Sequence, residues 1–180
     1  MRNLKKQAMK IIPIYLIMLT LIAACDNTQL RQAEVRKRMQ TNDKAAKYAT
    51  AVLAGGCFWC VEADLKKLPG VKDVISGYAG GQGKNPTYEN YTRLGHIEAV
   101  EVYYDPGEIS YEDILVYFLR HIDPTDEGGQ FADRGSGYRP AIFYQTEEEK
   151  NVAQRLLGEL DQYGKFSRPV AVALMKQTAF

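Results

Sequence analysis

Two cysteines that stand three residues apart are the strongest chemical signal in this chain of 180 residues. They lie in Gly55-Gly56-Cys57-Phe58-Trp59-Cys60, after an apolar run over residues 49–54 and before apolar residues at helical spacing. The pattern predicts Cys57 at a turn between a strand and a helix. The unpaired N–H groups and the positive dipole end of a helix N-terminus stabilise a thiolate, the nucleophilic form of cysteine. The alternative is that Cys57 and Cys60 are buried and only pack as small apolar residues.

A carboxylate is the second candidate. If residues 97–104 form a strand, Glu98 shares one face with Val100 and Val102, because side chains alternate along a strand. A carboxyl group among valines is partly desolvated, which raises its pKa and lets it donate a proton near neutral pH. The alternative is an exposed glutamate at a strand end, and the spacing alone does not separate the two interpretations.

The elements that must hold these groups alternate along the chain. Strands are predicted over residues 49–54, 71–76, 97–104, 141–144 and 170–174, and helices after Cys57, Ser110 and Thr146. Ser110 and Thr146 each precede an acidic residue by three positions, the spacing of a capping box. Two glycine-rich loops, over residues 82–95 and 125–139, have no apolar period, and long loops of this kind usually serve function. The order resembles the split βαβ core of ferredoxin-like folds, which predicts an α+β, two-layer sandwich with helices packed on a mixed, mostly antiparallel sheet.

The first 25 residues have the layout of a secretory signal. Four basic residues precede an apolar run over residues 11–24 that is too short for a comfortable membrane span. The run ends in Ile22-Ala23-Ala24-Cys25, which resembles the bacterial lipobox, so we expect Cys25 to be lipidated and to anchor the chain in the cell membrane. The alternatives are a plain signal peptide cleaved nearby and an uncleaved single-pass anchor. Each of them places the body of the chain outside the cytoplasm, on the periplasmic or extracellular side.

The remainder divides into a tether and one domain. Residues 26–47 are polar and basic with little apolar periodicity, which predicts a tether. Residues 48–180 are long enough for one catalytic domain, and 46% hydrophobic with 25% charged residues is ordinary globular composition. The net charge of +1 gives no reason to expect nucleic-acid binding. The cysteines and the two scattered histidines do not match the spacings of a zinc site, so we expect no metal. We also expect a monomer.

The cysteine turn begins a resemblance to a known family. Gly56-Cys57-Phe58-Trp59 followed by Val61-Glu62 resembles the active-site signature of the peptide methionine sulfoxide reductase A family. Further segments resemble that family's Asn-Pro-Thr-Tyr, Gly-His-x-Glu-Ala-Val and Asp-x-Gly-x-Gln-Tyr-Arg, and they are residues 85–88, 95–100 and 133–139. The resemblance covers about residues 50–180. One position departs from the pattern, because Gly137 stands where the family usually has Gln.

The resemblance implies an activity and roles for five residues. The activity is reduction of the S epimer of methionine sulfoxide, free or in oxidised proteins, to methionine. The implied nucleophile is Cys57, and the implied acid that protonates the sulfoxide oxygen is Glu98. Tyr88 and Tyr138 correspond to hydroxyl donors to that oxygen, and Asp133 to a polar residue beside the site.

The neighbours of Cys57 complete the expected site. Phe58 and Trp59 would form an apolar wall for the methyl group of the substrate. Attack by Cys57 on a sulfoxide leaves a sulfenic acid, which condenses with a second thiol. Many family members use a cysteine near the C-terminus, but no cysteine follows Cys60 in this chain. We therefore expect Cys60 to be the resolving thiol, a thioredoxin-like protein to reduce the resulting disulfide, and no bound cofactor.

Two rival functions stay open on the sequence. A membrane-anchored thiol–disulfide oxidoreductase would also use Cys57 and Cys60, but it gives no purpose to Glu98, Tyr88 and Tyr138. The second rival is a truncated and inactive relative, because the chain stops before the aromatic and acidic tail that family members generally have.

Overall fold

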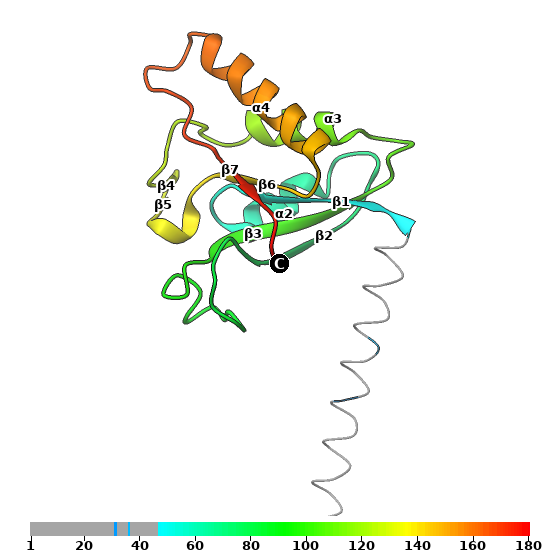
Figure 1. Ribbon diagram of the computed structural model, residues 1–180, viewed down its shortest axis with the longest axis vertical. Coiled ribbons are helices and arrows are strands. Elements are labelled where there is room, and N and C mark those ends of the chain that lie inside the picture. Colours follow the sequence, from blue (N-terminus) through cyan, green and yellow to red (C-terminus); the bar gives the residue numbers. More distant parts are fainter. Residues whose placement is uncertain (1–30, 32–35, 37–46) are drawn as a thin grey trace, which may run out of the picture. The chain divides into compact units, whose positions relative to one another are not determined.

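The computed structural model describes residues 31, 36 and 47–180 of the chain (Figure 1). The predicted signal peptide, its lipobox cysteine and nearly all of the predicted tether lie outside the described residues. Lys47–Phe180 form one compact unit. Within the part that the structure describes, none of the helices has the length and apolar character needed to cross a membrane.

A five-stranded sheet in the order β2-β3-β1-β6-β7 is the framework of this unit. The central strand β1 (Ala49–Ala54) pairs antiparallel with β3 (Ile97–Tyr104) on one side and with β6 (Ala141–Tyr144) on the other. Next to β3 lies β2 (Val71–Ala79), also antiparallel, and next to β6 lies β7 (Ala173–Lys176), which is parallel to it. The mixed, mostly antiparallel sheet expected from the sequence is confirmed.

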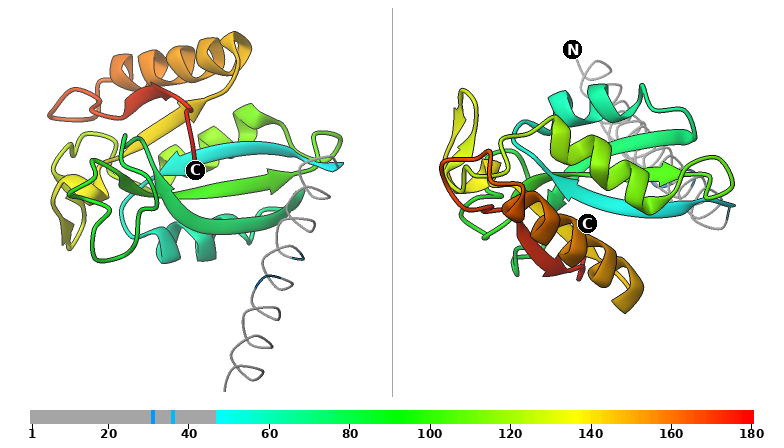
Figure 2. Two further views of the ribbon diagram at one scale, coloured as in Figure 1. Left: turned by 60° about the horizontal axis from the view of Figure 1, so that its bottom comes forward. Right: turned by 90° about the horizontal axis from the view of Figure 1, so that it is seen from above.

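Three helices pack on one face of this sheet, as the right panel of Figure 2 shows. They are α2 (Phe58–Leu65), α3 (Tyr111–Arg120) and α4 (Glu147–Gln162). The expected capping box starts α3, since the Ser110 hydroxyl accepts from the Asp113 N–H and the Asp113 carboxylate accepts from the Ser110 N–H. These helices bury apolar side chains against Leu53, Val100 and Ile142 from the strands, in one core cluster. Burying that surface is the main force that holds α2 in place.

Two strands differ from the sequence prediction, each for a local reason. The strand β2 is three residues longer, and its pairing with β3 continues through Gly77, where the Phe180 ring occupies the space of a side chain. The last strand begins at Ala173, because the Val170 N–H donates to the Asp161 side chain before pairing with β6 starts.

The loop over residues 125–139 also contains short elements that the sequence did not indicate. They are β4 (Gly129–Gln130), β5 (Asp133–Arg134) and the short 3-10 helix η1 (Ser136–Tyr138). The strands β4 and β5 pair antiparallel as a hairpin.

Candidate active site

Cys57 stands at the predicted turn between strand and helix. It is the N-terminal cap residue of α2, and its carbonyl oxygen accepts from the N–H groups of Cys60 and Val61. The turn depends on Gly56, whose φ of +88° is a conformation that other residues rarely adopt. A Cβ atom on Gly56 would also lie 2.6 Å from the Cβ of Gln130. The turn and the β4–β5 hairpin are therefore in direct contact.

Glu98 is buried beneath the first turn of α2. Its side chain is on the helix-covered face of β3 and is 1% exposed. The carboxylate Oε2 accepts from the Phe58 N–H at 3.0 Å, and Oε1 accepts from the Tyr91 hydroxyl at 3.2 Å. Burial raises the pKa of Glu98, the two hydrogen bonds lower it, and the charge of Asp133 raises it. The exposed alternative is wrong. Phe58, the residue after Cys57, connects the cysteine turn to a carboxyl group whose pKa is raised.

An aromatic cluster lies around Glu98 and the first turn of α2. It consists of Phe58, Trp59, Tyr78, Tyr88 and Tyr91. The Trp59 ring, 62% exposed, stacks on the Tyr88 ring with centroids 6.2 Å apart, while Phe58 is buried and contacts the rings of Trp59 and Tyr78. Two of the predicted site residues, Trp59 and Tyr88, therefore meet at the surface.

The remaining predicted residues come from the β5–η1 segment. Tyr138 and Asp133 are both half-buried. The neighbouring Tyr138 and Glu98 raise the pKa of the Tyr88 hydroxyl, and Cys57 and Asp133 act on it in the same direction. The five residues that the resemblance gives a role therefore lie close enough for four of them to act electrostatically on Tyr88, although they come from separate parts of the chain.

The two thiols lie on consecutive turns of backbone at the start of α2. Both are free in the structure, Cys57 half-buried and Cys60 exposed. The neighbouring Cys57 thiol is the main cause that raises the pKa of Cys60, and burial adds to it. Cys60, beside the Cys57 sulfur, therefore keeps its proton at neutral pH. This is the state expected of a thiol that is not itself the first nucleophile.

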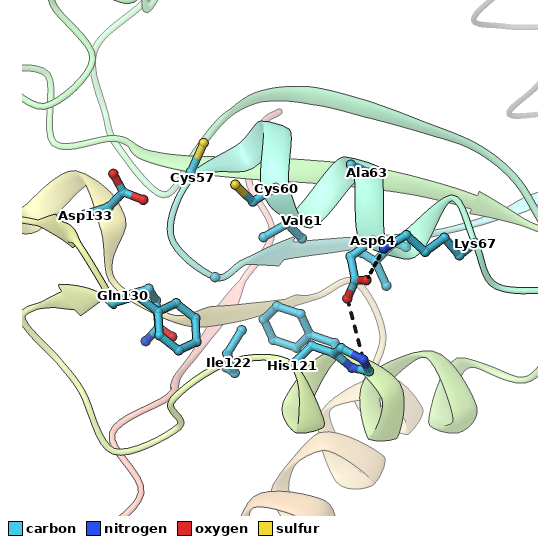
Figure 3. A pocket seen from close by; sticks show the side chains of 14 residues that line it. Cys57, Cys60, Val61, Ala63, Asp64, Lys67, His121, Ile122, Gln130 and Asp133 are labelled. Carbon is cyan, nitrogen blue, oxygen red and sulfur yellow. Dashed lines mark hydrogen bonds and ion pairs between the residues drawn. The ribbon is translucent and has the colours of Figure 1, made fainter.

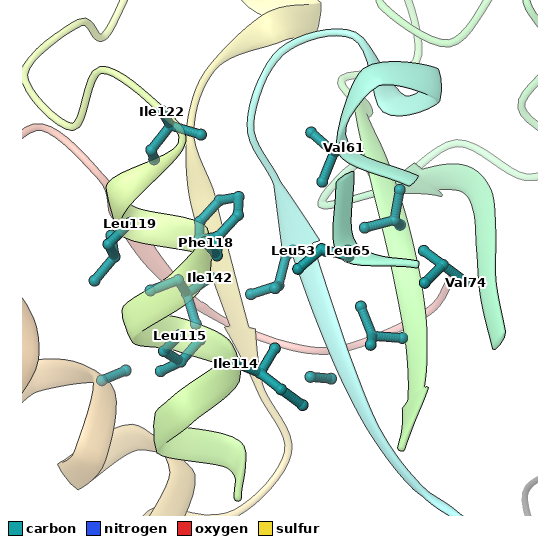
Figure 4. Close-up of a cluster of buried hydrophobic side chains, with 14 of the residues drawn as sticks. Leu53, Val61, Leu65, Val74, Ile114, Leu115, Phe118, Leu119, Ile122 and Ile142 are labelled. Carbon is teal, nitrogen blue, oxygen red and sulfur yellow. The ribbon is translucent and has the colours of Figure 1, made fainter. Parts of the chain in front are cut away.

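A pocket of about 260 Å³ opens next to both thiols (Figure 3). Cys57 and Cys60 lie at one end, Asp133 and Gln130 come from the β4–β5 hairpin, and His121 closes the side toward α3. Its floor includes Val61, Leu65, Phe118 and Ile122 of the core cluster (Figure 4). Both thiols therefore line a pocket that α2, the β4–β5 hairpin and the end of α3 enclose.

Neither histidine has the geometry of a base for Cys57. The His121 ring stacks on Tyr117 and its Nε2 lies 3.8 Å from the Asp64 carboxylate. The His96 ring is buried and contacts the Gly81 N–H and the Gly83 carbonyl oxygen, which fixes the loop after β2. Among the described residues, no group of three or more His, Cys, Asp or Glu side chains could hold a metal ion.

Comparison with known proteins decides the family. The profile described as "Peptide methionine sulfoxide reductase" matches residues 49–180. The chain is 43% identical over 132 residues to the peptide methionine sulfoxide reductase MsrA of Streptococcus agalactiae, covering 72% of this chain and 78% of that protein. It belongs to the MsrA family. The identity to the peptide methionine sulfoxide reductase MsrA/MsrB of Vibrio cholerae is higher, 53% over 138 residues. That alignment covers 76% of this chain but only 36% of the relative.

Solved structures of the MsrA family have the same fold. Mxr1 from Saccharomyces cerevisiae in reduced form aligns with a TM-score of 0.66 at 26% identity, over 75% of this chain and 79% of that chain. Methionine sulfoxide reductase A of Corynebacterium diphtheriae aligns with a TM-score of 0.60 at 28% identity, over 72% and 65% of the two chains.

The sequence did not indicate two residues that lie near Glu98 in this MsrA chain. Tyr78 is the register partner of Glu98 across β2 and β3, so it could have been found by pairing the two strands. Tyr91 is only 6% exposed and bonds to Glu98 directly. It lies in a loop without apolar period, and no spacing rule predicts which side chain of such a loop turns inward.

Proposed function

We propose that this chain reduces methionine-S-sulfoxide, free or in proteins, to methionine, with Cys57 as the nucleophile. One observation carries the proposal: the buried carboxyl group of Glu98 accepts a hydrogen bond from the N–H of Phe58, the residue that follows Cys57. A nucleophile and an acid are thereby held beside one another. Membership of the MsrA family supports the same reaction.

The first step moves two electrons from Cys57 to the sulfoxide sulfur. The Cys57 thiolate attacks the sulfoxide sulfur, a sulfur–sulfur bond forms, and the sulfur–oxygen bond breaks as the oxygen takes up two protons and leaves as water. A water molecule then attacks the Cys57 sulfur, the sulfur–sulfur bond breaks, and methionine leaves with its sulfur reduced, while Cys57 becomes a sulfenic acid and one proton is released. Because an oxide ion is a very poor leaving group, the reaction needs a proton donor near the oxygen.

Glu98 is the proton donor in this proposal. Burial raises the pKa of its carboxyl group, so a larger share of it is protonated near neutral pH than in an exposed glutamate. Tyr88 and Tyr138 would donate hydrogen bonds to the same oxygen, and the charge of Asp133 would help to keep Glu98 protonated. Phe58 and Trp59 would contact the methyl group, since they directly follow Cys57 and their rings contact each other with centroids 5.1 Å apart.

The second step returns the enzyme to its starting state. The Cys60 thiol attacks the Cys57 sulfenic acid, which forms a disulfide and releases water. A dithiol protein then reduces the disulfide and is itself oxidised. We propose a thioredoxin-like protein for this role, because the related Mxr1 has been solved in complex with Trx2. No cofactor is needed, and all the named side chains belong to one chain, which is consistent with a monomer.

We also propose that the enzyme works outside the cytoplasm as a lipoprotein. Residues 1–25 would be the signal peptide with Cys25 as the lipidated residue, residues 26–47 the tether and residues 48–180 the catalytic domain. The support is the lipobox-like sequence Ile22-Ala23-Ala24-Cys25. In a bacterial host fed labelled palmitate, the chain should carry the label and should be found in the membrane fraction. The Cys25→Ala variant should lose both the label and the membrane location. An unlabelled wild-type chain would contradict the anchor.

The reaction is tested with the two separated epimers of methionine sulfoxide. Reduced full-length protein without added reductant should release about one methionine per chain from the S epimer and none from the R epimer, since each Cys57 is oxidised once. Cys57→Ser should release none. Failure of folded wild-type protein to release methionine from either epimer would contradict the proposal.

The same assay separates this function from disulfide exchange. In Cys60→Ser the first release of methionine should persist, because forming the sulfenic acid requires only Cys57. A protein that exchanges disulfides needs both thiols and would lose its reaction in this variant.

A further inference from the structure

Gly137 has no backbone reason to be glycine. Its φ is not in the left-handed region, and it is buried within η1. A Cβ atom at this position would lie 2.7 Å from Cε2 and 2.8 Å from Oη of Tyr91, and 2.8 Å from Cγ2 of Thr92. Real Cβ atoms do not approach other atoms so closely, so Gly137 is a glycine because the Tyr91 ring occupies the space of its side chain. This is also the position at which the sequence departs from the family pattern.

The Tyr91 ring is fixed from several sides. It stacks on Tyr78 with ring centroids 4.8 Å apart. The Tyr91 N–H donates to the Thr87 carbonyl oxygen at 2.9 Å, and the Tyr91 carbonyl oxygen accepts from the His96 N–H at 2.9 Å. A ring with so little freedom can hold its hydroxyl group at one point, and that point is 3.2 Å from Oε1 of Glu98.

We propose that Tyr91 is the residue that positions the acid of this enzyme, and that Gly137 is its steric counterpart. The acid role of Glu98 rests on the proposed function. With Oε2 bonded to the Phe58 N–H and Oε1 to the Tyr91 hydroxyl, the carboxyl plane has one orientation. Tyr91 acts through Glu98, and Gly137 acts through Tyr91.

The hydroxyl group also adjusts how readily Glu98 gives up its proton. The hydrogen bond from Tyr91 lowers the pKa of Glu98, against burial and the charge of Asp133, which raise it. The other titratable groups that interact with Glu98 are Cys60, Tyr78 and Tyr88, and Tyr138 raises the pKa of Tyr91 itself. Loss of the Tyr91 hydroxyl should therefore move the pKa of Glu98 upward.

The first test is a carboxyl carbon-13 NMR titration of the reduced full-length chain labelled in glutamate. The Glu98 signal is assigned by its loss in Glu98→Gln. In Tyr91→Phe the pKa of Glu98 should rise by about one unit, the size expected when a carboxylate loses one hydrogen bond from a side chain. An unchanged or lower pKa would overturn the proposal.

Tyr103→Phe is the matched control. It also removes a buried tyrosine hydroxyl bonded to a glutamate, Oε2 of Glu101 at 2.5 Å, but this pair is not part of the site. Its Glu98 titration should coincide with that of the wild type. The titration needs no turnover, so a chain without reductase activity would refute the proposed function and still give a result for Tyr91.

The second test measures the steric pair by a double-mutant cycle. Gly137→Ala should lower the Tm by roughly 5 °C, because an overpacked site must shift. In the Tyr91→Ala background the same change should cost less, since the ring is gone and only the methyl group of Thr92 remains of the three nearest atoms. An equal loss in both backgrounds would overturn the pairing of Gly137 with Tyr91.

Discussion

The two parts of the chain that build the site are held in different ways. Cys57 and Glu98 are attached to β1, α2 and β3, whose apolar side chains share one core cluster. Tyr88, Tyr91 and Tyr138 come from segments between the main strands. A ring contact holds Tyr88, a side-chain hydrogen bond holds Tyr91, and a backbone hydrogen bond to Gly135 holds Tyr138. Cys57 and Glu98 therefore gain their positions from packing of the whole sheet, whereas the three tyrosines depend on individual hydrogen bonds and ring contacts.

The largest effect is expected from changing Glu98, the proposed acid, which lies on the packed sheet. Glu98→Gln keeps the size of the side chain and an acceptor for the Phe58 N–H but carries no acidic proton. The single-turnover rate of methionine release at neutral pH should fall by about 10²–10⁴-fold, the usual contribution of a general acid. Rapid-quench kinetics measure it, and thermal unfolding should show a folded protein. A rate close to the wild-type rate would mean that the proton comes from another group.

The contact between the cysteine turn and the β4–β5 hairpin, at Gly56 and Gln130, should be the next most sensitive point. Gly56→Ala forces an alanine to a φ of +88° and places its Cβ 2.6 Å from that of Gln130. The Tm should fall by roughly 5–10 °C, and methionine release should slow because Cys57 follows directly.

Gly158→Ala is the control for that substitution. A Cβ at Gly158 in α4 meets nothing within 4 Å, and alanine favours a helix over glycine by up to about 1 kcal/mol, so the Tm should hold or rise. If the Gly56→Ala and Gly158→Ala variants have the same Tm, the turn at Gly56 is not as constrained as its geometry indicates.

A hydroxyl donor from a loop should matter for rate but not for stability. Tyr88 is 55% exposed, so Tyr88→Phe should leave the Tm unchanged. Loss of one hydrogen bond to the reacting oxygen should slow single-turnover release by about tenfold. Tyr163→Phe, in another exposed tyrosine beyond α4, should leave the rate unchanged. Equal rates for the two variants would remove Tyr88 from the mechanism.

The smallest effect is a shift in pH dependence. Glu98 must be protonated to act, so the rate should fall as the pH rises through its pKa. The charge of Asp133 raises that pKa, and Asp133→Asn should therefore move the falling limb of the rate profile to lower pH, by a few tenths of a unit. The direction is opposite to that expected for Tyr91→Phe. A limb that moves upward in Asp133→Asn would contradict the electrostatic account.

The same division explains what the sequence could predict. The periodic pattern placed β1, β3 and β6 at their observed bounds, and the capping residues Ser110 and Thr146 start their helices. Alternation along β3 predicted that Glu98 shares a face with valines, but it did not decide whether Glu98 is buried, which the structure shows. These features follow from local rules that repeat along the chain.

The loops could not be predicted in this way. Nothing local indicates that the Tyr91 ring turns inward, that Gln130 packs on the cysteine turn, or that β4 and β5 form a hairpin. Each depends on contacts between residues far apart in sequence. Gly137 is instructive, because its departure from the family pattern was visible in the sequence, but its cause lies in the position of Tyr91.

The most direct test of the account is to trap the oxidised nucleophile. Reduced Cys60→Ser protein is mixed with methionine-S-sulfoxide and a carbon nucleophile that reacts only with sulfenic acids, and labelled peptides are counted by mass spectrometry against methionine released. The account predicts one label on Cys57 for each methionine, with none in Glu98→Gln on the same time scale. Methionine released without a label on Cys57 would contradict it.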